Sequence, residues 1–188
     1  MTTAPTRYHL LRRQRRRVLF VLASAAGSAL LTILSGALGG FRINTTPSEP
    51  IGLWRILPLE RKPAIGDMVF VCLPRSALVD EARSRGYLRR GLCASGYAPL
   101  IKTIVAVAGQ QVEITRTVRI DGAEIPNSAL ARADGAGRPL IAAGSERIRP
   151  SHVFLHSPFP GSWDSRYFGT VPASSILGFA QEVLTFAP

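Results

Sequence analysis

The 188-residue sequence predicts a mainly β domain, either a barrel or a sandwich, that follows one membrane-spanning helix. Three observations lead to this fold class. Residues 18–41 form a single uncharged apolar run near the N-terminus. Residues 42–188 contain many short segments rich in β-branched and aromatic residues, separated by glycine and proline. Within that part, only residues 76–85, where acids precede arginines, have a pattern typical of a helix.

The composition excludes a disordered chain and a disulfide-dense scaffold. Hydrophobic residues make up 46 % of the sequence, which is enough for a packed core, and only two cysteines are present. Two cysteines also exclude a four-thiolate zinc site. We expect neither a metal nor a cofactor.

The net charge of +11 is concentrated at the N-terminus. Six arginines and no acid lie in residues 1–17, and without these arginines the net charge is +5. Positive charge flanks membrane helices on the cytoplasmic side, so we predict that residues 1–17 form a cytoplasmic basic N-terminus. The cluster therefore indicates topology, and we expect no nucleic-acid partner because the rest of the chain lacks aromatic residues interleaved with basic ones.

The apolar run is long enough to cross a lipid bilayer. Its 24 residues would form a helix of about 36 Å, compared with a hydrocarbon core of about 30 Å. We therefore predict a transmembrane helix over residues 18–41 and an exported domain over residues 42–188. A cleaved secretory signal, with small residues at 35–40 as the cleavage site, and a buried core helix are the alternatives.

Export would place both cysteines in an oxidising compartment. Cys72 and Cys93 are 21 residues apart and flank the helix-like residues 76–85. We predict a disulfide between them, and two free buried thiols are the alternative.

The exported part is predicted to consist of short strands. They cover residues 51–57, 67–73, 100–109, 111–114, 117–120, 152–157 and 176–186. Asp121 and Gly122 follow one of these strands and predict a hairpin turn. Residues 127–150 lose the strand pattern, so we expect an insertion or a long surface loop there.

Lysine is rare in this sequence, and one of the two lysines, Lys102, lies in an unusual place. Of 23 basic residues only Lys62 and Lys102 are lysine, and Lys102 lies in an otherwise apolar strand while Lys62 lies in a polar turn. Burial can turn a lysine into a neutral base, which an arginine cannot become. A lysine at a strand end that extends to water is the alternative, and composition alone leaves both open.

A lysine base requires a nucleophile, and Ser48 is a candidate. It lies between Pro47 and Pro50, which keep this segment out of a helix and could present the hydroxyl from a rigid stretch. An ordinary stalk leaving the membrane is the alternative.

A third stretch of interest covers residues 158–172. Asp164 and Arg166 are two positions apart and could pair, and Ser162 and Ser165 add hydroxyl groups. A surface loop with an exposed ion pair of little energetic value is the alternative.

These stretches resemble the three sequence boxes of the bacterial type I signal peptidase family of Ser/Lys proteases. Residues 48–52 (SEPIG) resemble its nucleophile box, residues 101–105 (IKTIV) with Ala108 and Gly109 resemble its base box, and residues 162–169 (SWDSRYFG) resemble its third and most specific box. The likeness is closest to the conjugative-transfer branch, the TraF-type pilin-maturation peptidases.

The resemblance implies a role for each matching residue. Ser48 would be the nucleophile, and Lys102 would be the neutral general base. The backbone N–H of Ser48 and the hydroxyl of Thr46 would form the oxyanion hole. Ser162 would orient the lysine by a hydrogen bond. Two further residues would shape the site without reacting, namely Asp164 and Arg166.

The resemblance also implies a fold, a location and a substrate. We expect a signal-peptidase-like β domain in the periplasm, anchored by one span in the bacterial inner membrane, that acts as a membrane-bound serine endopeptidase. Its partners would be the lipid bilayer and a membrane-embedded preprotein or pilin precursor, which it would hydrolyse or convert to a cyclic product. Housekeeping members often carry methionine after the nucleophile, whereas this chain carries Glu49, which leaves the substrate range open.

Two other hypotheses compete with a Ser/Lys peptidase. One is a histidine-based hydrolase that uses His152 and His156, but four residues of a strand cover about 13 Å, too far to share a metal ion as a helical pair would. We expect ordinary strand or surface histidines instead. The other is a non-catalytic, membrane-anchored component of a conjugation or secretion apparatus.

Overall fold

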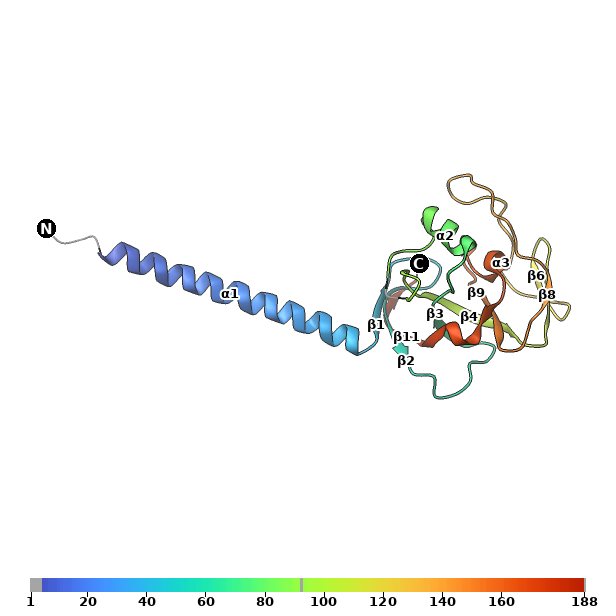
Figure 1. Cartoon of the computed structure of the whole chain (residues 1–188), viewed down its shortest axis with the longest axis horizontal. Coiled ribbons are helices and arrows are strands. Elements are labelled where there is room, and N and C mark those ends of the chain that lie inside the picture. The colour runs from blue at the N-terminus through green and yellow to red at the C-terminus, as the bar shows by residue number, and fades with distance from the viewer. Residues whose placement is uncertain (1–4, 92, 188) are drawn as a thin grey trace. The chain divides into compact units, whose positions relative to one another are not determined.

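The computed structural model describes residues 5–91 and 93–187, and it divides into two compact units, Met1–Phe41 and Arg42–Pro188. The first unit is the long helix α1, Pro5–Leu38 (Figure 1). Its segment Leu11–Gly36, with a mean hydropathy of 2.1, is long and apolar enough to cross a membrane. The helix begins well before the predicted residue 18, because arginine is a good helix former. It ends before Gly40, whose φ of 75° is not helical.

The second unit is built on antiparallel sheets, which confirms the mainly β prediction. A seven-stranded sheet has the order β1-β2-β11-β3-β4-β9-β10. This order is open, so among the described residues the sheet is not a closed barrel. Its strands are β1 Phe41–Asn44, β2 Ile51–Leu57, β3 Met68–Val71, β4 Leu100–Val107, β9 His152–His156, β10 Val171–Pro172 and β11 Ile176–Phe186.

A smaller sheet has the order β7-β6-β5-β8, and its strands lie in the sequence between β4 and β9 of the large sheet. Its strands are β5 Gln111–Ile114, β6 Val118–Ile120, β7 Ala123–Glu124 and β8 Glu146–Arg147. Asp121 and Gly122 join β6 to β7 with φ values of 49° and 83°, so the predicted hairpin is confirmed.

Short helices complete the second unit. Helix α2, Ala77–Ser84, begins at Ser76, whose Oγ accepts a hydrogen bond from the Val79 N–H at 3.3 Å. Helix α3, Ser165–Phe168, is a single turn in the stretch that sequence reasoning left without regular structure, and the short 3-10 helix Ala173–Ser175 follows it.

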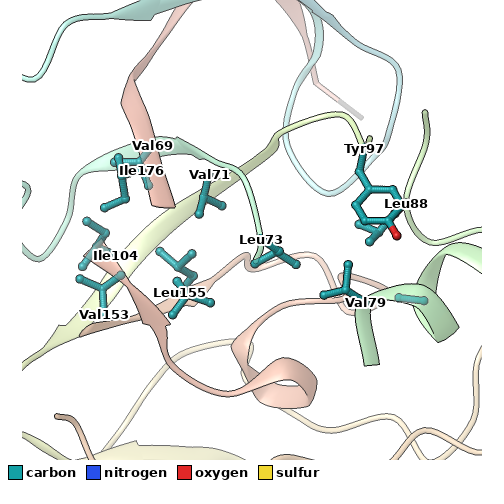
Figure 2. Packing of buried hydrophobic residues seen from close by; sticks show 12 residues of the cluster. Val69, Val71, Leu73, Val79, Leu88, Tyr97, Ile104, Val153, Leu155 and Ile176 are labelled. Carbon is teal, nitrogen blue, oxygen red and sulfur yellow. The ribbon is translucent and has the colours of Figure 1, made fainter. Parts of the chain in front are cut away.

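The main core lies between the large sheet and helix α2. Figure 2 shows side chains from β3, β4, β9 and β11 packed against one another, with Val79 of α2 near Leu73 and Leu88. The sheet residues in this cluster are Val69, Val71, Ile104, Val153, Leu155, Val171 and Ile176. This packing fixes the central strands β3, β4 and β9, and strand β4 carries Lys102.

A disulfide joins Cys72, directly after β3, to Cys93, with a Cα–Cα distance of 5.6 Å. The predicted disulfide is therefore confirmed. It closes the segment that contains helix α2 against the end of β3.

Candidate active site

The side chains of Ser48 and Lys102 are in direct contact. Lys102 Nζ donates a hydrogen bond to Ser48 Oγ at 3.2 Å, although the two residues are 54 positions apart. Lys102 lies on strand β4, and Ser48 lies in the loop between β1 and β2. The structure thus brings together the predicted nucleophile and the predicted base.

The loop that carries Ser48 is held by side-chain hydrogen bonds to its backbone. Asn44 Nδ2 lies 2.8–3.0 Å from the carbonyl oxygens of Thr46, Glu49 and Pro50, and Asn44 Oδ1 accepts the Thr46 N–H at 3.0 Å. Ser157 Oγ donates a hydrogen bond to the carbonyl oxygen of Ser48. These hydrogen bonds fix the backbone around Ser48 next to the end of strand β9.

The backbone at position 52, the last residue of the Ser-Glu-Pro-Ile-Gly stretch, requires a glycine. Its φ is 140°, and a Cβ added there would lie 2.2 Å from the carbonyl oxygen of Leu184 on strand β11. Only glycine permits this backbone conformation together with so close an approach of β2 and β11.

Lys102 is almost completely removed from solvent, with 2 % of its surface exposed. The alternative of a lysine that extends to water is therefore wrong. Burial lowers the pKa of Lys102, while the negative charges of Asp164 and Glu49 act in the opposite direction and Arg166 adds to the lowering. A lowered pKa favours the neutral amine, which is the form that can accept a proton.

Asp164 and Arg166 form a buried ion pair and not an exposed one, so the surface-loop alternative is wrong. Both side chains are fully buried, with Arg166 Nε 2.8 Å from Asp164 Oδ1 and Arg166 Nη2 2.9 Å from Asp164 Oδ2. Arg166 also donates to the carbonyl oxygens of Ala129 and Ser162 at 2.7 and 3.0 Å. The pair joins the third sequence box to the 127–150 segment.

Two predicted supporting residues have other partners or none in this structure. Ser162 Oγ is buried and has no hydrogen-bond partner among residues 5–91 and 93–187, so the expected bond to Lys102 is not formed. Thr46 Oγ1 donates to Asn44 Oδ1 at 2.7 Å, so its proton is not directed at a substrate. Both residues line the same cavity as Ser48 and Lys102.

Sequence reasoning missed four residues at this site. Asn44 and Ser157 were not singled out, Glu49 was weighed only for its effect on substrate range, and His156 was expected to be an ordinary histidine. His156 is 4 % exposed, and its Nδ1 lies 3.3 Å from Asp164 Oδ2. A side-chain amide four residues before Ser48 is a turn-forming signal that could have revealed Asn44, whereas no local pattern marks the burial of Glu49 or His156.

A cavity of about 360 Å³ opens beside the Ser48–Lys102 pair. Residues from the 127–150 segment form one wall, including Ala131, Asp134 and Leu140. The wall is tied down by Tyr87, whose hydroxyl donates to Asp134 Oδ2 at 2.5 Å. This volume accommodates several side chains of an extended peptide.

In the part of the chain that the structure describes, no group of three or more histidine, cysteine and acidic side chains is placed to hold a metal ion. The polar groups that the structure places together at the site are the Ser48 hydroxyl, the Lys102 amine and the Asp164–Arg166 ion pair. A hydroxyl in contact with a buried amine is an arrangement that can support nucleophilic catalysis.

The sequence matches the family described as "Signal peptidase, peptidase S26" over residues 14–185. The chain belongs to the S26 signal peptidase family. Over 177 residues it is 55 % identical to a probable conjugal transfer protein TraF of Sinorhizobium fredii, a match that covers 94 % of each chain. It is 53 % identical to a conjugal transfer protein TraF of Agrobacterium tumefaciens, over 94 % of this chain and 99 % of the other.

A solved signal peptidase I from Enterococcus faecalis is 20 % identical to this S26 family member. It aligns with a TM-score of 0.39 over 63 % of this chain and 97 % of that chain. Membership of a peptidase family and the apolar N-terminal helix together indicate a membrane-anchored peptidase.

Proposed function

We propose that this S26 family member is a membrane-bound serine endopeptidase that cleaves exported precursors by a Ser48–Lys102 dyad. The observation that carries the proposal is the hydrogen bond from Lys102 Nζ to Ser48 Oγ at 3.2 Å, at the edge of a peptide-sized cavity. Lys102 is buried, and its lowered pKa favours the neutral amine that a general base requires.

The reaction begins when neutral Lys102 accepts the proton of the Ser48 hydroxyl while Oγ attacks the scissile carbonyl carbon. The resulting ammonium ion gives this proton to the leaving amine as the peptide C–N bond breaks, and an acyl-enzyme remains on Ser48. Lys102, neutral again, then accepts a proton from the attacking water and returns it to Ser48 Oγ as the ester bond breaks. An amine of the substrate in place of water yields a cyclic product.

Developing negative charge on the carbonyl oxygen requires hydrogen-bond donors. The backbone N–H of Ser48 is one donor. The Thr46 hydroxyl is the second, once it rotates away from Asn44 Oδ1, which accepts its proton in the present structure. Each such donor typically contributes a few kcal/mol to stabilisation of the transition state.

The substrate that we propose is the pilin precursor of a conjugative system, since the relatives carry conjugal transfer names. We place the anchor in the bacterial inner membrane with residues 1–17 in the cytoplasm and residues 42–188 in the periplasm. The basic cluster before the apolar segment and the Cys72–Cys93 disulfide support this topology. Alkaline phosphatase fused after residue 188 should be active in cells, since that enzyme requires export.

The test is mass spectrometry of a pilin precursor co-expressed with the wild-type chain or with variants. Wild type and Lys62→Ala, a matched control at an exposed lysine, should shorten the precursor, whereas Ser48→Ala and Lys102→Ala should not. A product lighter than the linear fragment by one water identifies cyclisation. Equal shortening by all four proteins would contradict the dyad, and no shortening of any exported precursor in a panel would favour a non-catalytic component.

A further inference from the structure

Glu49 is a buried carboxylic acid directly after Ser48. Its side chain is 5 % exposed, and its Oε1 has no hydrogen-bond partner within residues 5–91 and 93–187. Burying an ionisable group without a full set of partners is costly, and such groups are concentrated at functional sites. The dyad mechanism gives Glu49 no role, so its burial calls for a separate explanation.

Charged and polar groups from three strands surround this carboxyl. Lys102 lies on β4, His156 is the last residue of β9, Ser157 follows it directly, and Glu182 lies on β11. Burial raises the pKa of Glu49, while Lys102, Ser157 and His156 act in the opposite direction and Glu182 raises it further. Lys102 is the largest of the opposing influences. Glu49 directly follows Ser48, whose Oγ lies 3.2 Å from Lys102 Nζ, so the two buried side chains belong to the same site.

Asp164, the other carboxylate near Lys102, is already paired with Arg166. Asp164 receives two hydrogen bonds from Arg166 at 2.8 and 2.9 Å, and the positive charge of Arg166 disfavours an ammonium ion on Lys102. The effect of Asp164 on Lys102 is therefore partly cancelled by Arg166. Glu49 is the second acid that favours the charged form of Lys102.

We propose that Glu49 is a positioning residue that supplies the counter-charge for the Lys102 ammonium ion formed while Ser48 is acylated. The proposal rests on the Ser/Lys function proposed above. The proton moves from the Ser48 hydroxyl to Lys102 Nζ and then to the leaving amine. Burial raises the pKa of Glu49, but a positive charge on Lys102 favours the carboxylate, so Glu49 acts in this form and neither gains nor loses an atom. Glu49 thereby adds to the stabilisation of a buried charge that Asp164, itself paired with Arg166, stabilises only in part.

The proposal predicts the direction in which the titration of Lys102 shifts when the charge of Glu49 is removed. Removal of the negative charge at residue 49 disfavours the ammonium form, so Lys102 loses its proton at a lower pH. Below the titration midpoint, the fraction of reactive neutral amine then rises about tenfold for each unit by which the midpoint falls.

The sequence provides an internal reference for this measurement, because Lys62 and Lys102 are its only lysines. The full-length chain in detergent micelles is treated with a trace of acetic anhydride over a range of pH, and the acetylation of each lysine is measured by peptide mass spectrometry. This readout reports the protonation of Lys102 directly and requires no peptide cleavage. A failure of the peptidase proposal would therefore be seen separately, in the precursor assay.

Two substitutions and one control test the inference. Glu49→Gln keeps the shape of the side chain, and Glu49→Met places an apolar side chain of similar length in the buried position. Both should shift the Lys102 titration to lower pH and leave Lys62 unchanged. Glu182→Gln, at an exposed acid that also faces Glu49, should leave Lys102 unchanged.

An unchanged or higher Lys102 midpoint in a folded Glu49 variant would overturn the proposal. A variant has lost its fold if its Lys102 reacts in the same way as the exposed Lys62. In that case the other Glu49 variant is used to test the proposal. If neither variant folds, Glu49 serves folding and the proposal is contradicted.

Discussion

Ser157 Oγ donates a hydrogen bond to the backbone carbonyl of Ser48, across 109 positions of sequence. The contact ties the loop that carries the proposed nucleophile to the end of strand β9, the strand that pairs with β4 and its Lys102. Ser48 and Lys102 are therefore held against the same pair of central strands. Their distance depends on the sheet, on this hydroxyl group and on the hydrogen bonds from Asn44 that also hold the loop.

Ser157→Ala should reduce turnover more than substrate binding. Without the hydrogen bond, the Ser48 loop is less well fixed, and small misplacements of reacting groups cost roughly tenfold to a hundredfold in rate. We expect kcat for precursor cleavage to fall by about that factor with little change in KM. Ser157→Thr, which keeps the hydroxyl, should retain most of the activity, whereas an alanine variant with wild-type kcat would show that the contact is dispensable.

The pH dependence of cleavage should report Lys102. Burial lowers its pKa, so the neutral base becomes available below the ordinary lysine value of about 10.4. The logarithm of kcat/KM should rise with pH at a slope of about one and level off below that value. His156→Gln should leave this limb in place. A limb at a pH typical of histidine that disappears in His156→Gln would instead indicate a histidine base.

Asp164→Asn should destabilise the domain strongly, because it leaves the guanidinium of Arg166 buried without a counter-charge. Removal of one partner of a buried ion pair costs about 3–5 kcal/mol. Glu81→Gln, which removes the exposed pair with Arg85, should cost far less, because solvent screens the two charges. Urea unfolding of the three proteins checks this, and equal stabilities would contradict the structural importance of the pair.

Asp164 should also make the stability of the domain depend on pH. Burial alone would raise the pKa of Asp164, but His156 and Arg166 hold it below its ordinary value. The pKa of Asp164 is lower in the folded state than in the unfolded state. Ionised Asp164 therefore contributes fully to the free energy of unfolding above the unfolded pKa of about 3.9, and this contribution is lost as the pH falls through the folded pKa. Wild type should therefore lose this contribution in acid, and Asp164→Asn should lack it.

Reduction of the Cys72–Cys93 disulfide should lower the free energy of unfolding by about 3 kcal/mol, since it opens a loop of 21 residues. Urea unfolding with and without dithiothreitol measures the difference. The double variant Cys72→Ser, Cys93→Ser should match the reduced protein and show no response to the reductant. Two reactive thiols in the unfolded, unreduced protein would contradict the bond.

Much of the fold could be predicted because its signals are local. Segments rich in β-branched and aromatic residues, bounded by glycine and proline, located the principal strands, and acids followed by arginines in residues 76–85 indicated α2. The order of the strands could not be predicted, because it depends on pairing between distant segments such as β11 with β2 and β3. Helix α3 was also missed, because a single turn capped by Asp164 has no periodic pattern.

The site was predictable where it depends on residue type and not where it depends on burial. A lysine in an apolar strand and a serine between prolines pointed to Lys102 and Ser48, and the structure places them in contact. Glu49 and His156 are polar in sequence but buried in the fold, so only the tertiary structure reveals them. The hydroxyls of Ser162 and Thr46 are near the site, yet their hydrogen bonds differ from those expected.

The central claim is that Ser48 becomes acylated with Lys102 as the base, and the most direct test is to detect the acyl-enzyme. Purified full-length protein is mixed with the precursor, quenched in acid at short times and digested for mass spectrometry. Wild type should show a substrate fragment attached to the Ser48 peptide, while Ser48→Ala and Lys102→Arg should show none, because a guanidinium cannot act as a base. Acylation at another residue, or full acylation of Ser48 in Lys102→Arg, would contradict the account.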